Sequence, residues 1–349
     1  MAYGTLMTLD TLAASQASIV QIGEVDAFRA IDAALAAHNR IMLDMLAPLV
    51  ERTTDRRRRY GGADQMMMDV LDEFGRADAQ KVAAGSDVDF PLQLFGGSIQ
   101  WTRKFFQNAT GAELAAQVTA MMTADTRRFI LEIKKALFNP TNATVLDRLV
   151  DNTGLNIKRL VNADSAPIPL GPNGETFDAA THTHYLGTAA FVAANLTSLI
   201  DTVVEHQSIG QVMVYINAAQ EAAVRGFVGF TAYTDARLIN QTAGVIANRS
   251  LDMVNVNNRA IGVFGAAEVW VKTWQPSGYV LALVEGATPP LVYRTRNGGG
   301  NLELVADDEA HPLRARSWER EYGIGVWGRT SAAALRTNNA VYAMPTLTA

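Results

Sequence analysis

Two segments of the chain carry apolar residues at the three- and four-residue spacing of amphipathic helices. The first, about Glu24 to Leu46, is followed by Pro48, which cannot continue a helix. The second opens with a capping box, in which the side chains of Thr110 and Glu113 each accept from the other's backbone amide. It stops at Asn139, so the predicted helix is roughly 40 Å long. That length is unusual for a globular domain and suggests an elongated, flat subunit.

The segment between these helices shows the two-residue alternation of β-strands. Apolar and other residues alternate in Phe90–Leu94 and again in Ile99–Trp101. An apolar-rich stretch, Gln65–Phe74, and a polar one, Gly75–Gly85, come before them. We interpret Tyr60–Gln107 as an extended hairpin with a long polar tip. Because an isolated two-stranded ribbon is marginally stable in water, this hairpin must rest on its own domain or on a neighbouring chain.

The second half of the chain predicts a mixed α/β unit from Leu186 to about Arg296. We expect an apolar helix over Leu186–Val204 and a short buried strand at Val212–Ile216. Asn217 is placed to cap a following helix that continues through Val224. Two further strands are predicted within residues 263–284, around a Gln-Pro-Ser-Gly turn.

Two stretches lack strong periodicity. Met1–Gly23 predicts an extended arm, and the Pro- and Gly-rich Ile168–Glu175 predicts a loop. Met1–Val20 also lacks the basic start and the continuous apolar core of a signal peptide. No apolar run approaches the length of a membrane-spanning helix, so we expect no membrane association.

Composition narrows the function classes further. The chain has 349 residues, of which 48% are hydrophobic and 19% charged, as in globular proteins. A net charge of −5 does not favour binding of a phosphate backbone as the main task. The absence of cysteine excludes disulfides, thiolate nucleophiles and cysteine-ligated zinc. No nucleophile elbow and no P-loop occur in the sequence. We therefore expect no catalytic, cofactor-binding or metal-binding residues, and no enzyme activity.

One motif could point to an enzyme. Gly323, Gly325 and Gly328 have the Gly-x-Gly-x-x-Gly spacing that cradles a dinucleotide in many dehydrogenases. That function requires a strand before the glycines, a helix after them and an acidic residue about 20 positions on. Too few residues follow for such a unit, and Tyr322–Trp327 alternates as a strand does. We therefore favour a strand and keep a nucleotide-dependent oxidoreductase as the alternative from another function class.

Histidines form the other candidate site. His182 and His184 would lie on one face of a strand, and His206 could lie nearby. The two alternatives are a metal site and a hydrogen-bonded or interfacial role, and the His-x-His spacing alone favours the second.

Several smaller clusters have simpler interpretations. Arg56–Arg59 predicts a solvated or partner-facing charge cluster rather than a nucleic-acid patch, because no aromatic residues alternate with the arginines. Gly298–Gly300 predicts a flexible turn, and Asp307–Glu309 a solvated polar turn. Met66–Met68 predicts gap-filling at an apolar contact.

In their order and spacing, several segments resemble the major capsid proteins of tailed bacteriophages, which have the Hong Kong 97 fold. The resemblance covers about Arg56 to Met344. It is carried by the long capped helix and by these segments: Asp72–Val82, Phe90–Phe95, Trp101–Phe105, His311–Arg316, Glu319–Glu321 and Gly323–Thr330.

The resemblance implies an α+β fold with five parts. They are an N-terminal arm and helix (1–55), an extension loop (56–109), a peripheral domain with a long spine helix (110–185), an axial domain (186–300) and return strands of the peripheral domain (301–349). The extension loop would lie across a neighbouring subunit, which supplies the support that the predicted hairpin needs.

The same resemblance implies a function and a set of partners. The chain would self-assemble into hexamers and pentamers of an icosahedral shell that encloses double-stranded DNA. It would assemble in the host cytoplasm and end in the virion. Further partners would be a portal, a decoration protein and a separate scaffolding protein, the last because only about 23 residues precede the first predicted helix. The alternative within this class is an encapsulin, a shell that holds a protein cargo.

Two further details concern contacts between subunits. Some members of this family join a loop lysine covalently to a neighbour's asparagine, for which Lys81, Asn338 and Asn339 are the candidates here. No acidic residue can be assigned to that reaction, so we do not expect the cross-link. The charged run Arg314–Glu321 predicts an edge that meets another subunit.

Overall fold

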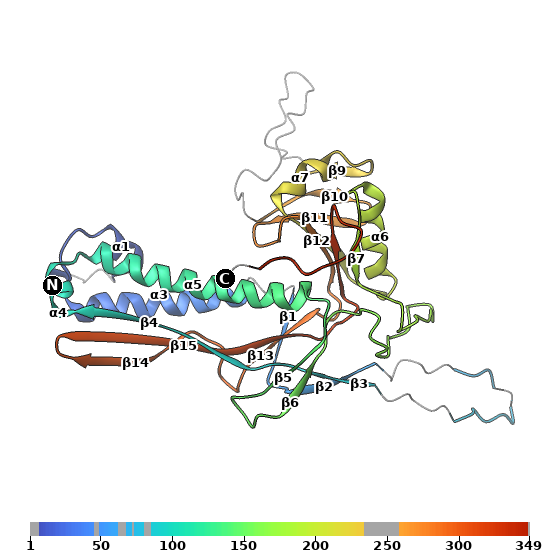
Figure 1. Cartoon of the computed structure of the whole chain (residues 1–349), viewed down its shortest axis with the longest axis horizontal. Helices are drawn as coiled ribbons and strands as arrows, with labels where there is room; N and C mark the ends of the chain where they lie inside the picture. Colours follow the sequence, from blue (N-terminus) through green and yellow to red (C-terminus); the bar gives the residue numbers. More distant parts are fainter. Residues whose placement is uncertain are drawn as a thin grey trace, which may run out of the picture.

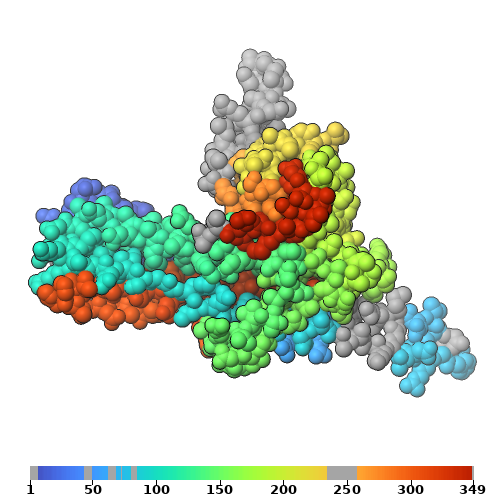
Figure 2. Space-filling view, in the orientation of Figure 1, coloured from blue at the N-terminus to red at the C-terminus, as the bar shows by residue number. Residues whose placement is uncertain are grey.

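The computed structural model describes residues 7–44, 49–61, 68–71, 73–79, 85–233 and 258–347. It has three parts (Figure 1). Long helices lie beside long strands at one end, and a second sheet with its own helices rises at the other. At the lower right, beyond the second sheet, residues 68–71 and 73–79 stand clear of the rest of the subunit (Figure 2).

The helical layer is built on α3 (Glu24–Asp44) and α5 (Gly111–Phe138), which pack on each other. Both predicted long helices are confirmed. For α3 this holds as far as Asp44, because the following residues lie outside the described ones. In the predicted capping box of α5, the amide of Glu113 donates to the Thr110 hydroxyl at 3.3 Å. The amide of Thr110 donates to the Glu113 carboxylate at 2.8 Å. A third helix, α4 (Arg103–Asn108), precedes α5.

The expectation of an extended arm before α3 was wrong for the described residues. Two short helices lie there, α1 (Leu9–Ala14) and α2 (Ile19–Ile22), and each has its own capping box. Leu12 and Ile19 are fully buried in the same apolar cluster as α5. Helices this short show no apolar period in the sequence, because their stability comes from caps and tertiary packing.

The long strands form a five-stranded sheet beside α5. On the main path the order is β1 (Val50–Thr53), β13 (Leu291–Arg294), β15 (Leu313–Val326) and β14 (Glu303–Ala310). The fifth strand, β4 (Gln93–Thr102), pairs antiparallel with β15 along its whole length. The alternation expected at residues 90–94 and 99–101 corresponds to one strand, β4, which includes residues 93–94 and 99–101, pairs with β15 and leaves residues 90–92 outside it. The Gly-Gly pair in its middle interrupts the apolar alternation but not the strand.

Two further pairs of short strands form two-stranded sheets of their own. The first joins β2 (Arg57–Tyr60) to β3 (Ser86–Asp89), and its register pairs Arg57 with Asp89. The second joins β5 (Ala143–Leu146) to β6 (Gly154–Ile157), and β6 contacts β3.

The second large sheet has seven strands in the order β7-β16-β12-β8-β11-β10-β9. Its strands are β7 (Tyr185–Gly187), β8 (Gln211–Ile216), β9 (Phe230–Ala232), β10 (Asn258–Phe264), β11 (Ala267–Lys272), β12 (Tyr279–Glu285) and β16 (Ala332–Arg336). Helices α6 (Ala193–Val204) and α7 (Ala218–Arg225) accompany it, and Asn217 caps α7 as predicted.

Three expectations for this region need correction. The apolar helix begins at Ala193 rather than Leu186, because residues 185–187 pair with β16. The strands β11 and β12 flank the predicted turn but both pair with β8, which lies between them. Of the residues expected to be return strands (301–349), those of β16 join this sheet, whereas β13, which falls within the region 186–300, belongs to the five-stranded sheet.

One apolar cluster connects the two sheets. It includes Phe129 and Ile133 of α5, Tyr322 of β15, and Tyr215 and Leu281 of the seven-stranded sheet. The ring of Phe129 lies 5.1 Å from that of Tyr322. Because the same core serves both parts, the long helix α5 and the second sheet are held in one packed body.

Candidate functional site: the base of the protruding hairpin

The protruding hairpin, which consists of β2, β3 and the residues between them (57–89), carries exposed apolar side chains. Met68 is 97% exposed and Val70 is fully exposed, and Leu71 and Phe74 are also open to solvent. Met68 therefore does not fill a gap in an apolar contact of its own subunit, as was expected for Met66–Met68. The other two methionines lie outside the described residues. Apolar side chains gathered on a protruding segment are typical of a contact with another chain.

A buried carboxylate fixes the start of this hairpin. The Asp89 side chain is fully buried and accepts from Arg57 through both oxygens, at 2.5 and 3.0 Å. It also accepts from the backbone amide of Asn156 in β6 at 2.6 Å. Burial raises the pKa of Asp89, but the bonds from Arg57 and Asn156 outweigh it, and the net pKa is lowered. One carboxylate thus joins β2, β3 and β6.

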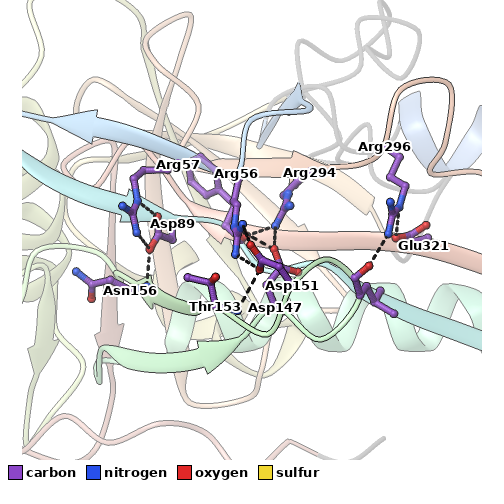
Figure 3. Close-up of polar contacts among 12 residues, drawn as sticks. Arg56, Arg57, Asp89, Asp147, Asp151, Thr153, Asn156, Arg294, Arg296 and Glu321 are labelled. Carbon is purple, nitrogen blue, oxygen red and sulfur yellow. Dashed lines mark hydrogen bonds and ion pairs between the residues drawn. The ribbon is translucent and has the colours of Figure 1, made fainter.

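A second buried carboxylate lies beside it (Figure 3). Asp147 is paired with Arg56 at 3.2 Å and with Arg294 of β13 at the same distance. Arg56 also forms a bidentate pair with Asp151, in which its two terminal nitrogens donate to the two carboxylate oxygens at 2.8 and 2.6 Å. The hydrogen bond from Arg56, supported by the amide of Thr153, holds the pKa of Asp151 well below its usual range. Planar guanidinium–carboxylate pairs of this kind fix direction as well as distance, so they set the angle at which the hairpin leaves the body.

These contacts make the prediction for Arg56–Arg59 more specific, because the Arg57 and Arg59 side chains are 52% and 66% exposed, as in a solvated charge cluster. All four arginines pair with carboxylates of their own chain. Arg58 pairs with Glu51 and Asp55, and Arg59 pairs with Asp87. The carboxylates come from β1, the β1–β2 connection, β3 and the β5–β6 loop, and several are far from the arginines in sequence. No local sequence pattern reveals such partners.

The charged run in β15 also differs from its prediction. On one side β15 pairs with β14 and, further along, with β13. On the other side it pairs with β4, so Arg314–Glu321 is not a free edge. Arg316 and Arg320 are buried. Arg316 pairs with Asp307 at 2.8 Å, and Arg320 pairs with Asp125 of α5 at 3.0 Å. Asp307 therefore lies in strand β14 as a partner of arginines, not in a solvated turn.

The glycines of the Gly-x-Gly-x-x-Gly motif lie in and just after β15, and the strand prediction is confirmed. A Cβ at Gly323 would lie 1.8 Å from the carbonyl oxygen of Pro91, and one at Gly325 would lie 2.6 Å from the Phe90 ring. After Gly328 the chain turns directly into β16, with no helix. These glycines let the chain before β4 pass close to β15, and the context that a dinucleotide needs is not there.

The structure brings the three predicted histidines together. The Nε2 atom of His182 lies 3.2 Å from that of His184 and 2.9 Å from that of His206. Glu205, which sequence reasoning missed, joins them, and its Oε1 lies 3.5 Å from His182 Nε2. Its position directly before His206 was the available signal. Burial lowers the pKa of all three imidazoles, that of His206 to about 4.

Gly298 and Gly300 have positive φ in the connection between β13 and β14, as expected of a turn. Lys81 lies outside the described residues, and the amide of Asn339 bonds to the backbone of Thr188 at 2.6 Å.

A groove lies on the body, between α5 and β4. Its volume is about 1060 Å³, and its lining includes Leu94 of β4, Met121 of α5 and Val145 and Leu146 of β5. Leu94 and Leu146 are each about half exposed, so the groove presents apolar surface to solvent.

Known proteins match this chain in three-dimensional structure but not in sequence. No protein-family model matches the chain, and no curated protein matches it in sequence. A solved structure from Mycobacterium phage Patience superimposes with a TM-score of 0.66 at 19% identity, covering 99% of this chain and 96% of that one. The chain has the fold of the tailed-phage major capsid proteins. The α+β capsid fold implied by the sequence is thereby confirmed.

Two other shells are more distant. The capsid of an empty GTA particle gives a TM-score of 0.48 at 13% identity, covering 84% of this chain and 89% of that one. An encapsulin complex from Synechococcus elongatus gives 0.42 at 10% identity, covering 87% and 90%. Among the described helices of this chain, none has the length and apolar character required to cross a membrane.

Proposed function

We propose that this chain is the major capsid protein of a tailed phage, which assembles as hexamers and pentamers into an icosahedral shell around double-stranded DNA. The protruding hairpin carries this proposal. Its apolar tip is exposed in the isolated subunit, yet its base is fixed by buried arginine–carboxylate pairs at Asp89 and Asp147. A segment that is held firmly and exposes apolar side chains is suited to contact a second copy.

The groove between α5 and β4 is the surface we assign to the neighbour's hairpin tip. It offers half-exposed leucines, and the tip offers Met68, Val70 and Leu71. Burial of these side chains would contribute about 25 cal/mol for each Å² of apolar surface removed from water. The contact is heterologous, joining two different surfaces of the same chain, so it repeats from subunit to subunit and forms a ring when the rotation closes.

Engineered cysteines test this contact directly, because the natural chain contains none. We expect Val70→Cys combined with Leu94→Cys to form disulfides between subunits on assembly and oxidation. Non-reducing gel electrophoresis would then show a ladder of dimers and higher species. The matched control keeps Val70→Cys but places the second cysteine at Val341, which is 71% exposed outside the groove, and should give no ladder. Equal ladders from both pairs would contradict the assignment.

Electron microscopy of the expressed protein tests the function as a whole. Closed icosahedral particles are expected, and particles purified from infected cells should contain nuclease-protected DNA. Shells that hold a protein cargo and no DNA would favour the encapsulin alternative, and a persistently monomeric protein would overturn the proposal.

The partners and the place of assembly are part of the same proposal. Formation of the shell in the host cytoplasm would use a separate scaffolding protein and a portal, with a decoration protein as a further candidate partner. The mild net negative charge of the chain supports the proposal that the inner surface of the shell binds packaged DNA only weakly. The work proposed is geometric rather than catalytic, so we propose that the chain is not an enzyme.

A further inference from the structure

Three histidines and one glutamate converge beside the β7 end of the seven-stranded sheet. His182 and His184 precede β7, and Glu205 and His206 follow α6. One ligand atom from each of these four residues lies within 4.8 Å of all the others. From this geometry we infer a metal site that binds one divalent zinc-like ion through three imidazole nitrogens and the Glu205 carboxylate.

The distances fit such an ion. Three nitrogens around a tetrahedral zinc, with bonds of 2.0–2.1 Å, lie about 3.3 Å apart. The two contacts of His182 Nε2, at 3.2 and 2.9 Å, are close to that value. Glu205 Oε1 lies 3.5 Å from His182 Nε2 and 3.7 Å from His206 Nε2, where a fourth ligand of the same ion would be.

The cluster is harder to explain by hydrogen bonds alone. His184 Nδ1 lies 2.8 Å from the carbonyl oxygen of Ala332, which can only accept, so Nδ1 carries the proton and the neutral ring keeps a lone pair on Nε2. His182 Nε2 carries either one proton or one lone pair. It therefore cannot make a full hydrogen bond to both His184 and His206. A cation accepts all three lone pairs together.

The surroundings have the form of a supporting shell. The bond from His184 Nδ1 to Ala332 fixes the orientation of the ring, as partners of metal-bound histidines do. The Phe177 ring packs 4.1 Å from the ring of His206 and 5.0 Å from that of His182. His184 and His206 are buried, whereas the Glu205 side chain is 39% exposed and leaves an entry path.

The ligand set indicates the metal and its role. Imidazole with one carboxylate suits zinc, cobalt or nickel better than calcium or magnesium, which prefer oxygen ligands. Four protein ligands close a tetrahedral site, so the ion would be structural rather than catalytic. It would join the segment before β7 to the end of α6, next to the first residue of β16. This inference departs from the sequence-based expectation of no metal site, because Glu205 was not recognised.

Metal analysis of the full-length protein tests the inference without requiring assembly. Protein stripped with EDTA is titrated with Zn²⁺ by calorimetry, and bound zinc is measured by mass spectrometry after dialysis. We expect about one zinc per subunit, a higher melting temperature with zinc, and the visible absorption of tetrahedral Co²⁺ after cobalt substitution. Wild-type protein that binds no zinc would overturn the inference.

Variants locate the ion. His182→Gln and His206→Gln should each weaken zinc binding by at least about 100-fold, beyond the 10–100-fold typical of supporting residues. His311→Gln, which changes an exposed histidine in the β14–β15 turn, is the matched control and should bind zinc as wild type does. If the buried His206 variant fails to fold, Glu205→Gln is the second test, with an expected loss of about 10-fold or more. Zinc binding that is unchanged in His182→Gln and in Glu205→Gln would refute the site.

Discussion

At the scale of single residues, the structure depends on positions where the chain allows no alternative side chain. Gly323 is one, because β15 runs so close to Pro91 that any Cβ would meet the Pro91 carbonyl oxygen at 1.8 Å. Backbone cannot move aside as a flexible side chain can. Gly97 in the adjoining strand β4 is different, since the nearest atom to its Cβ would be Met121 Cγ at 4.0 Å.

This contrast gives a stability prediction. Gly323→Ala should lower the free energy of unfolding of the unassembled subunit by about 3 kcal/mol or more, because either β15 or the chain before β4 must shift. Gly97→Ala should change it by less than about 0.5 kcal/mol. Urea unfolding followed by tryptophan fluorescence measures both. Similar losses in the two variants would show that the close approach at Gly323 is not what matters.

At the scale of elements, the features predicted well are those whose causes are local. The capping box at Thr110 and Glu113 and the apolar period after it determine α5, and both can be seen in the sequence. The single strand β4 was missed because the Gly96–Gly97 pair breaks the alternation, while pairing with β15 keeps the strand continuous. Tertiary pairing overrides local pattern in such cases.

The hairpin is the element with the clearest separate role. Deletion of Gly75–Gly85 should abolish shell assembly while the subunit stays soluble and folded, because the buried pairs at Asp89 and Asp147 belong to the base. Size-exclusion chromatography and electron microscopy would measure assembly, and circular dichroism would check the fold. Normal shells from this variant would contradict the role of the hairpin.

The candidate sites follow the same division between local and non-local causes. The sequence shows the three histidines, but not that they lie close together. Their proximity depends on α6, which returns Glu205 and His206 to the segment before β7. The arginines at the hairpin base were likewise visible, whereas Asp147 and Asp151 reach them from a different hairpin. A sequence supplies the chemical groups, and only the topology determines which of them meet.

At the scale of the whole molecule, the two sheets are coupled by packing and by charge. The shared apolar cluster joins α5 to the seven-stranded sheet. Close to it, Arg329 in the β15–β16 connection pairs with Asp164 at 2.7 Å and is fully buried. Asn142 and Lys158 also bond to the Asp164 carboxylate, at 2.7 and 3.1 Å. Asp164 therefore links the segment that follows α5 to the connection that enters β16 of the second sheet.

This link predicts how the subunit responds to acid. Burial raises the pKa of Asp164, but the charge and hydrogen bond of Arg329 outweigh it and lower the pKa from 3.8 to about 2. The folded state thus binds fewer protons than the unfolded chain between these values. The resulting stabilisation, about 2 kcal/mol, is complete above about pH 5 and is lost progressively as the pH falls through 4 toward 2 and below.

Asp164→Asn isolates this contribution. At pH 7 it should lower the free energy of unfolding by about 3 kcal/mol, because it leaves the buried Arg329 without its charged partner. The gap between wild type and variant should narrow as the pH falls from 4 toward 2, as the wild-type carboxyl becomes neutral. Asp26→Asn is the control, because its surface pair with Arg29 should contribute less than about 1 kcal/mol at any pH. Urea unfolding at pH 7, 4 and 3 gives the comparison, and a gap that stays constant across this series would show that Asp164 does not couple the two parts through its charge.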